Sequence, residues 1–136
     1  MFPKYHIISS ALLSILLYPF FGLNVLFVFF VGFLIDIDHY IYYVFKFRNL
    51  DLKKSYKYFE DYPKRRHFVD CLCIFHTIEF FILFALLSFY SKIVFLIFVS
   101  IILHEVLDLI EMYRLNLWEA RASSLIMWLK RNVLIR

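Results

Sequence analysis

Residues 23–45 have the sequence LNVLFVFFVGFLIDIDHYIYYVF. The stretch contains no Lys or Arg and is long enough to cross a bilayer as a helix, which needs about 20 mostly apolar residues. Near its end, however, it carries three ionisable side chains, Asp36, Asp38 and His39. The stretch therefore predicts a membrane-spanning helix with costly polar groups towards one end.

The composition of the whole chain agrees with a membrane protein. Its 136 residues are 63% hydrophobic and 19% charged, whereas soluble domains average about 45–50% apolar and about 25% charged residues. Two glycines argue against a β-rich or loop-rich fold, and Cys71 and Cys73 cannot form the disulfide framework of a small secreted protein. We expect a single membrane-embedded helical domain over residues 1–136.

Three further stretches lack Lys and Arg: residues 5–21, 68–90 and 93–113. We interpret the first as a retained span rather than a signal peptide, because no small-residue cleavage site follows it. The loop at 46–66 is expected to lie at the membrane interface, and so is an amphipathic helix at 117–136. The predicted fold is all-α: an integral membrane four-helix bundle with an interfacial loop helix and a C-terminal amphipathic helix.

The positions of the cations predict how this bundle is oriented. One of the 15 Lys and Arg residues precedes the first span, eight lie in the loop at 46–66 and five follow the last span, which leaves only Lys92 on the other side. The positive-inside rule then predicts a multi-pass protein of the cell membrane, inner or plasma, with both termini in the cytoplasm. Lys residues interleaved with Tyr and Phe in the loop favour contact with membrane lipids over binding of nucleic acid. A homo-oligomer stays open.

The ionisable residues inside the spans share one depth. Asp36, His76 and His104 each lie ten residues from the nearest Lys or Arg at the cytoplasmic boundary of their span, or about 15 Å along a helix. Helical spacing also pairs residues on common faces: Asp36 with His39, His76 with Glu79, and His104 with Asp108. Asp38 lies about 200° around a helix from Asp36. Either the helix loosens at residues 35–39, or one aspartate has a supporting role.

Five carboxylates at this depth would cost about 12–17 kcal/mol if they were charged and unpaired. No Lys or Arg lies inside the spans to neutralise them, so we expect one or two divalent transition metal ions, zinc first, with manganese and iron as alternatives. The candidate ligands are His6, Asp36, Asp38, His39, His76, His104 and Asp108. An interfacial histidine is an equal interpretation of His6. For the Cys71-x-Cys73 pair, packing is favoured over ligation.

Two other roles complete the predicted site. Glu79 or Glu105 would accept the proton of an activated water. A cationic group at the membrane boundary would contact the substrate. For the histidine in this group, the competing interpretation is that it is simply solvated at the level of the lipid headgroups. This group consists of Lys64, Arg65, Arg66 and His67.

The sequence at 35–39, IDIDH, resembles the Pro-Asp-x-Asp-His signature of the small membrane-bound metal-dependent hydrolases, whose relatives include a LexA-binding inner-membrane protein. His6, His76-Thr77 and the His-x-x-x-Asp pattern at 104–108 are similar to that family's other motifs, in the same order. The resemblance implies hydrolysis at a metal centre. The family's proline is replaced by Ile35, and its middle motif is stretched by four residues. A looser similarity to the helical zinc-dependent phospholipases C points to phosphoester substrates.

The function predicted from these features is metal-dependent hydrolysis of a lipid phosphoester or similar amphiphile from the cytoplasmic side. A metal or proton transporter is the main alternative, and a structural or partner-binding membrane protein is the other. A transporter needs polar groups along its whole path. The outer halves of the spans offer little beyond Ser14, Asn24, Ser88 and Ser100, which favours a closed pocket over a conduit.

Overall fold

The computed structural model describes residues 3–61, 71–118 and 121–134, and every regular element in these ranges is helical, which confirms the all-α class. The long elements are α1 (Pro3–Phe21), α2 (Val25–Leu34), α3 (Ile37–Phe47), α4 (Leu52–Glu60), α5 (Ile78–Leu87) and α6 (Lys92–Leu115). Shorter ones are the 3-10 turns η1 (Gly22–Asn24) and η3 (Ile74–His76), helix α7 (Leu125–Leu129) and the π-helical η4 (Lys130–Leu134).

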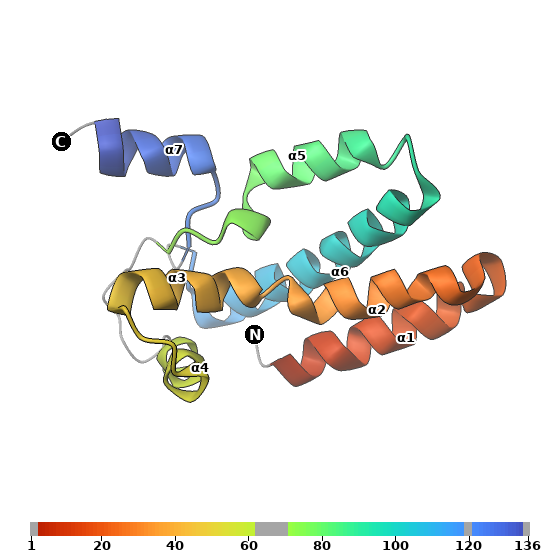
Figure 1. Cartoon of the computed structure of the whole chain (residues 1–136), viewed down its shortest axis with the longest axis horizontal. Helices are drawn as coiled ribbons and strands as arrows, with labels where there is room; N and C mark the ends of the chain where they lie inside the picture. Colours follow the sequence, from red (N-terminus) through yellow and green to blue (C-terminus); the bar gives the residue numbers. More distant parts are fainter. Residues whose placement is uncertain (1–2, 62–70, 119–120, 135–136) are drawn as a thin grey trace.

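Helices α1 and α2 form a hairpin around the turn η1 (Figure 1). The turn begins at Gly22, whose φ of +56° lies in the left-handed region that glycine enters most easily. Helix α2 packs against both α1 and α6. The three helices approach closely at Gly32, where a Cβ would lie 2.0 Å from Ser10 Oγ and 3.0 Å from Ser100 Oγ. Small residues at such contacts are typical of helix packing in membranes.

The helix over residues 23–45 is interrupted where the sequence suggested that it could loosen. Helix α2 ends at Leu34 and α3 begins at Ile37, so Asp36 becomes the residue that precedes α3. The amide of His39 donates to the Asp36 carbonyl over 3.1 Å, and the two elements remain nearly continuous. The interruption changes the helical angle between the two aspartates and lets both point towards the same region.

Two helical stretches are long and apolar enough to cross a membrane: Lys4–Phe47, which holds α1 to α3, and Lys92–Leu115. The predicted continuous helix over 68–90 is wrong between residues 71 and 77, where the chain is extended or forms the short turn η3. Helix α5 covers ten residues of that stretch, about 15 Å, and is too short to cross a hydrocarbon core of about 30 Å alone. The complete four-helix bundle therefore stays a prediction.

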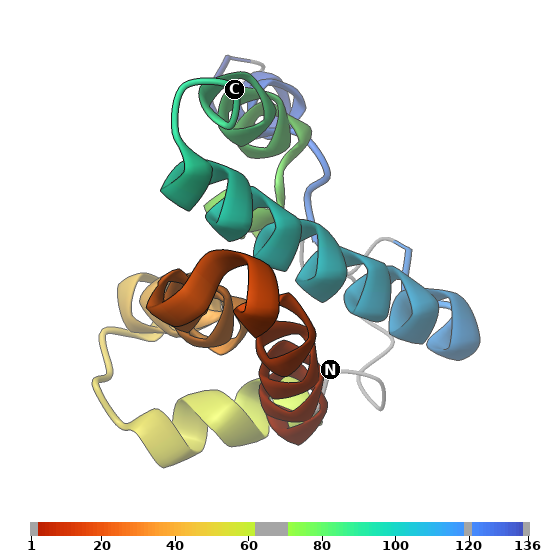
Figure 2. The same ribbon diagram turned by 90° about the vertical axis from the view of Figure 1, so that its right-hand side faces the viewer.

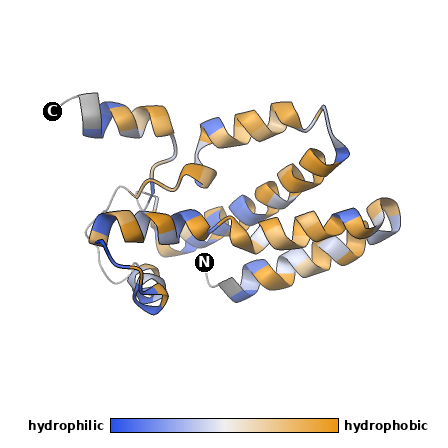
Figure 3. Cartoon of the chain, in the orientation of Figure 1, coloured by the Kyte–Doolittle hydropathy of each residue, from blue (hydrophilic) through white to orange (hydrophobic). Residues whose placement is uncertain are grey.

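Many large apolar side chains are exposed, while the interior contains polar side chains beside apolar ones such as Val28 and Leu96. Large apolar residues face outward, with Leu16, Phe20 and Phe89 exposed by 69%, 78% and 86%. The interior holds His6 and His104, which are 1% and 2% exposed. Figure 3 shows that hydrophobic residues predominate along α1, α2, α5 and α6. An extended apolar surface indicates contact with a membrane or a partner. Inside a bilayer, lipid tails would cover this surface.

The segment after α6 differs from the predicted amphipathic helix over 117–136. Within the described part of that stretch, residues 121–124 are not helical, and helix begins only at Leu125. Arg121 instead pairs with Cys71 in an isolated parallel bridge, and the Ala122 amide donates to the Cys71 carbonyl over 2.9 Å. Figure 2 shows α6 passing between the α1–α2 hairpin and the pair formed by α5 and α7. The sequence also predicts a helix in the loop at 46–66, and α4 confirms that this loop contains a helix.

Candidate metal centre

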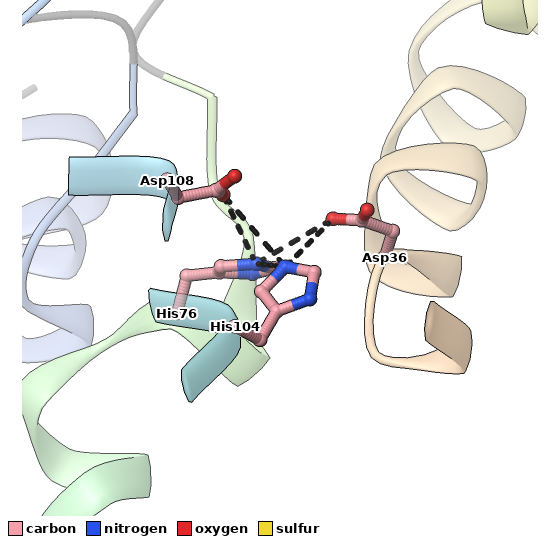
Figure 4. Close-up of side chains that lie close together, drawn as sticks. All are labelled: Asp36, His76, His104 and Asp108. Atoms are coloured by element: carbon pink, nitrogen blue, oxygen red, sulfur yellow. Dashed lines mark hydrogen bonds and ion pairs between the residues drawn. The ribbon is translucent and has the colours of Figure 1, made fainter. Parts of the chain in front are cut away.

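Four side chains from three separate segments converge in the interior. Asp36 comes from the α2–α3 junction, His76 from η3, and His104 and Asp108 from one face of α6 (Figure 4). Each offers one ligand atom within 4.8 Å of the others, and three of the four residues are buried. We call Asp36, His76, His104 and Asp108 the metal centre below.

The distances between these ligand atoms suit a small cation. The Nε2 atoms of His76 and His104 lie 3.2 Å apart. Asp36 Oδ1 lies 3.6 Å and 3.3 Å from these two nitrogens, and Asp108 Oδ2 lies 3.7 Å and 3.8 Å from them. Four ligands on zinc, with bonds of about 2.0–2.2 Å in a tetrahedron, are separated by about 3.3–3.6 Å. The centre is therefore close to the required size.

Hydrogen bonds at the far side of both imidazoles fix which nitrogen carries the proton. His104 Nδ1 donates to the Gly32 carbonyl over 2.8 Å, and a carbonyl can only accept. His76 Nδ1 donates to Asp38 Oδ2 over 3.0 Å. In neutral rings both Nε2 atoms then present lone pairs to each other and to two carboxylate oxygens. Four converging acceptors repel one another unless a proton or a metal ion lies among them, and ligand histidines usually have such partners on their other nitrogen.

His6 is also part of this interior, at the edge of the centre. Its ring stacks on His104, with centroids 3.8 Å apart and an angle of 18° between planes. Its Nε2 lies 3.2 Å from Asp108 Oδ1, yet neither ring nitrogen makes a hydrogen bond of ordinary geometry with the described residues. At 1% exposure His6 is not the interfacial histidine of the alternative interpretation. A buried imidazole without hydrogen bonds is a plausible additional cation ligand.

Asp38 and His39 lie beside the centre and support it. Besides His76, Asp38 Oδ2 accepts the Phe75 amide over 3.0 Å, and Asp38 Oδ1 accepts from His39 Nδ1 over 2.9 Å. The second aspartate thus has the supporting role that the sequence left open, because it orients His76. His39 Nδ1 also lies 3.4 Å from Asp36 Oδ1.

Glu79 and Glu105, the two predicted proton acceptors, are both engaged elsewhere. Glu79 accepts hydrogen bonds from the Ser124 hydroxyl and from the amides of Leu125 and Ile126, at the start of α7. These contacts anchor α7 and do not direct Glu79 to the metal centre. Glu105 forms an ion pair with Arg121. A role for either as the proton acceptor stays a prediction.

Arg121 is the site residue that sequence reasoning missed. It was assigned to an amphipathic tail, but its side chain is only 8% exposed, and Nη1 donates to Asp108 Oδ2 over 3.1 Å. A cation therefore does reach the buried acids, from outside the spans. The signal available in the sequence was weak, since nothing in the tail distinguishes this arginine from the three other cations that follow α6.

The charges at the centre still do not balance. Among the described residues, four carboxylates, those of Asp36, Asp38, Glu105 and Asp108, face one guanidinium, and the charges of these groups alone leave three negative charges when the histidines are neutral. Buried charge of this size is costly in a membrane. One divalent cation would offset two of the three charges. The donors fit such an ion, although they do not identify which metal it is.

A cavity of about 930 Å³ opens onto this centre. Asp36 and Asp108 line it, together with Arg121, and α4 contributes Lys53 and aromatic side chains, Tyr56 and Phe59. The cavity therefore combines apolar walls with cations next to the centre. The predicted substrate contacts Lys64, Arg65, Arg66 and His67 lie outside the described residues.

Comparison with known proteins gives no relatives: no family model matches the chain, and neither a curated protein nor a solved structure is similar to it.

Proposed function

We propose that this protein is a membrane-embedded, metal-dependent hydrolase that acts on a lipid phosphoester or a similar amphiphile. One observation carries the proposal: two histidine Nε2 atoms with fixed tautomers meet two carboxylate oxygens within 4.8 Å, next to a cavity that reaches them. A purely structural cluster would gain nothing from four mutually repelling acceptors in a low-dielectric interior.

His76, His104, Asp36 and Asp108 would hold the ion, with zinc as the first expectation. A divalent ion at this position supplies Lewis acidity and an activated water for hydrolysis. The chain itself does the positioning. The Asp38 carboxylate orients the imidazole of His76, and the Gly32 carbonyl orients that of His104. The α2–α3 interruption brings Asp36 towards α6.

The cavity supports an amphiphilic substrate with a negative headgroup. Arg121 also lines the cavity, where its guanidinium is already bound to Asp108 and Glu105, so it contributes positive potential and not a free pair of donors. Lys53 and Arg114 add positive charge to a lining that also contains Glu60 and Glu111, while Tyr56 and Phe59 supply apolar wall. A lipid can reach such a pocket sideways from its own leaflet, so only the scissile bond needs to move to the centre.

The membrane topology belongs to the same proposal. With 14 of 15 Lys and Arg residues on one side of the predicted spans, the positive-inside rule places both termini, α4 and the mouth of the cavity at the cytoplasmic face. The resemblance of the motif at 35–39 to the membrane-bound metal-dependent hydrolases supports the same class of reaction. Contact with anionic lipid is expected on the side of α4.

The transporter alternative gains no support from the buried hydroxyls. Ser14 donates to the carbonyls of Ser10 and Val25, and Ser100 donates to the carbonyl of Val28. These serines therefore join α1 and α6 to α2, a common use of hydroxyls in membrane helices. These hydrogen bonds engage the hydroxyl groups that a polar path beyond the metal centre would need.

The test is metal content and hydrolysis measured on the same samples. The detergent-purified chain, an Asp36→Asn variant, a His104→Ala variant and an exposed control, Asp51→Asn, would be analysed for bound metal and incubated with mixed micelles of phosphatidic acid and phosphatidylglycerol. We expect stoichiometric transition metal and phosphoester cleavage in wild type and control, and loss of both in the two centre variants. Wild type without stoichiometric metal would overturn the proposal. So would metal-dependent flux into liposomes that His104→Ala abolishes, if cleavage is absent.

A further inference from the structure

Two buried thiols lie beside the metal centre and have no role in the proposed hydrolysis. Cys71 and Cys73 are 2% and 0% exposed, and their Sγ atoms are 3.2 Å apart. Both are free cysteines. Buried cysteines usually act as small apolar residues, so a further role needs additional evidence.

The backbone gives the first piece of evidence, because it turns both thiols to one side. Residues 71–73 are not helical, and Cys73 has extended angles, φ −103° and ψ 97°. In an extended chain, residues i and i+2 share a face, whereas in a helix they would lie about 200° apart. The Ala122 amide holds this arrangement by donating to the Cys71 carbonyl over 2.9 Å.

The face that carries the thiols is directed at further ligands. Asp38, His39 and Cys73 each offer a ligand atom within 4.8 Å of the others, and Cys71 Sγ contacts Cys73 Sγ. Sulfur, imidazole and carboxylate together make the donor set of a thiophilic cation such as zinc. His39 and both cysteines also line the 930 Å³ cavity, which gives an ion a route to them.

We propose that Asp38, His39, Cys71 and Cys73 form a second cation site, which binds a thiophilic divalent ion such as Zn²⁺, Co²⁺ or Cd²⁺. The geometry requires little movement, since bonds of about 2.3 Å to two sulfurs in a tetrahedron separate them by about 3.8 Å. Binding converts both thiols to thiolates and releases their protons to solvent. Asp38 joins the two sites, because its other oxygen holds His76 of the metal centre. The inference does not depend on hydrolysis.

Cobalt tests the site directly, because thiolate ligands give Co²⁺ an intense near-ultraviolet charge-transfer absorption that nitrogen and oxygen ligands do not. The reduced full chain in detergent would be titrated with Co²⁺ alone. We expect two equivalents bound in wild type, with the charge-transfer band. The double variant Cys71→Ser/Cys73→Ser should bind one equivalent without the band, and each single variant should retain about half of its intensity.

One variant in each site makes the result independent of the proposed hydrolase. His104→Ala should lose one equivalent of Co²⁺ and keep the charge-transfer band, even if the protein hydrolyses nothing. His39→Ala should weaken the band while leaving the metal centre loaded. Alkylation of the cysteines by iodoacetamide should also slow at least tenfold when Cd²⁺ is added.

Three results would overturn the second site. The first is a wild-type titration that matches the double serine variant in stoichiometry and spectrum. The second is a charge-transfer band that the double serine variant still shows, since the band would then come from sulfur ligands other than Cys71 and Cys73. The third is an alkylation rate that does not change with Cd²⁺, since the two thiols would then be packing residues only. Serine is close to cysteine in size, so the variants should fold.

Discussion

Arg121 donates from Nη1 to Oδ2 of Asp108 over 3.1 Å, although Asp108 lies within α6 and Arg121 follows the end of that helix in the sequence. The same guanidinium pairs with Glu105, one turn earlier on that helix. The segment after α6 therefore folds back over the buried acids and supplies the one fixed cation that they contact among the described residues. Arg121 is part of the metal centre's electrostatics rather than of an interfacial surface.

Replacing Arg121 should destabilise the protein more than any other change in the segment after α6. In Arg121→Ala, two buried carboxylates lose their partner, and the free energy of unfolding should fall by about 3–5 kcal/mol. Arg121→Lys should recover only part of this loss, since an ammonium cannot bridge two carboxylates as a planar guanidinium does. Thermal unfolding in detergent measures the effect. Arg114→Ala, an exposed neighbour, is the control, and equal loss in both variants would contradict the structural role.

Asp38→Asn should weaken the metal centre without removing a ligand from it. The Asp38 carboxylate orients His76 through Nδ1, and loss of such a partner typically lowers metal affinity about 10–100-fold. The variant is best made in a Cys71→Ser/Cys73→Ser background, so that only the metal centre is titrated. Competition with a chelator gives the affinity. An unchanged affinity would mean that the orientation of His76 does not depend on Asp38.

Gly32→Ala should disturb the centre by steric overlap. The new methyl group would lie 2.0 Å from Ser10 Oγ and 2.7 Å from Ser10 Cβ, and we expect a loss of about 1–3 kcal/mol in unfolding free energy. Metal affinity should fall as well, because the Gly32 carbonyl orients His104. The exchange Ser10→Gly with Gly32→Ala removes both overlaps and should restore much of the stability. If the double variant is no better than Gly32→Ala, the overlap with Ser10 is not the cause.

Glu79→Gln distinguishes an anchor from a catalytic base. Since Glu79 accepts three hydrogen bonds at the start of α7, the variant should release α7 and speed tryptic cleavage at Lys130 and Arg131. Metal content should stay the same. Hydrolysis should change by no more than about twofold, whereas loss of a general base typically costs a factor of about 10²–10⁴. A loss of that size with an intact α7 would restore the catalytic role.

The orientation in the membrane can be tested with two cysteines in the Cys71→Ser/Cys73→Ser background. Ser55 is 3% exposed and would label poorly, whereas Lys53 on the same helix is exposed. An impermeant maleimide should label Lys53→Cys only after the cells are opened. It should label Tyr90→Cys, between α5 and α6, in intact cells. The reverse pattern would invert the proposed topology.

Much of the site could be anticipated because ionisable side chains in apolar stretches are energetically costly. Asp36, His76 and His104 lie at one depth in apolar stretches, Asp108 shares a helical face with His104, and the structure brings these four together. A loosened helix at residues 35–39 was one of two explanations that the sequence offered for the positions of Asp36 and Asp38, and the helix is interrupted there.

What the sequence could not predict depends on contacts between distant segments. Residues 71–77 are apolar enough for a helix, but the Cys71 carbonyl and the Ile78 amide pair with residues 121–123 instead. That pairing carries Arg121 inward and turns the two cysteines to one side. Periodicity is a local property and contains no information about it, so Arg121 was placed on the surface and Glu79 was expected to face His76.

The position of Arg121 after α6 also orders the events of biosynthesis. In the proposed membrane topology, Glu105 and Asp108 leave the ribosome before their cation does, so α6 would enter the bilayer with both acids uncompensated, at a cost of about 2.5–3.5 kcal/mol each. The apolar first half of α6 must drive its insertion alone. Only when the following segment has been synthesised and has folded back can the acids be neutralised. Maturation of the centre is therefore a late step, separate from integration into the bilayer.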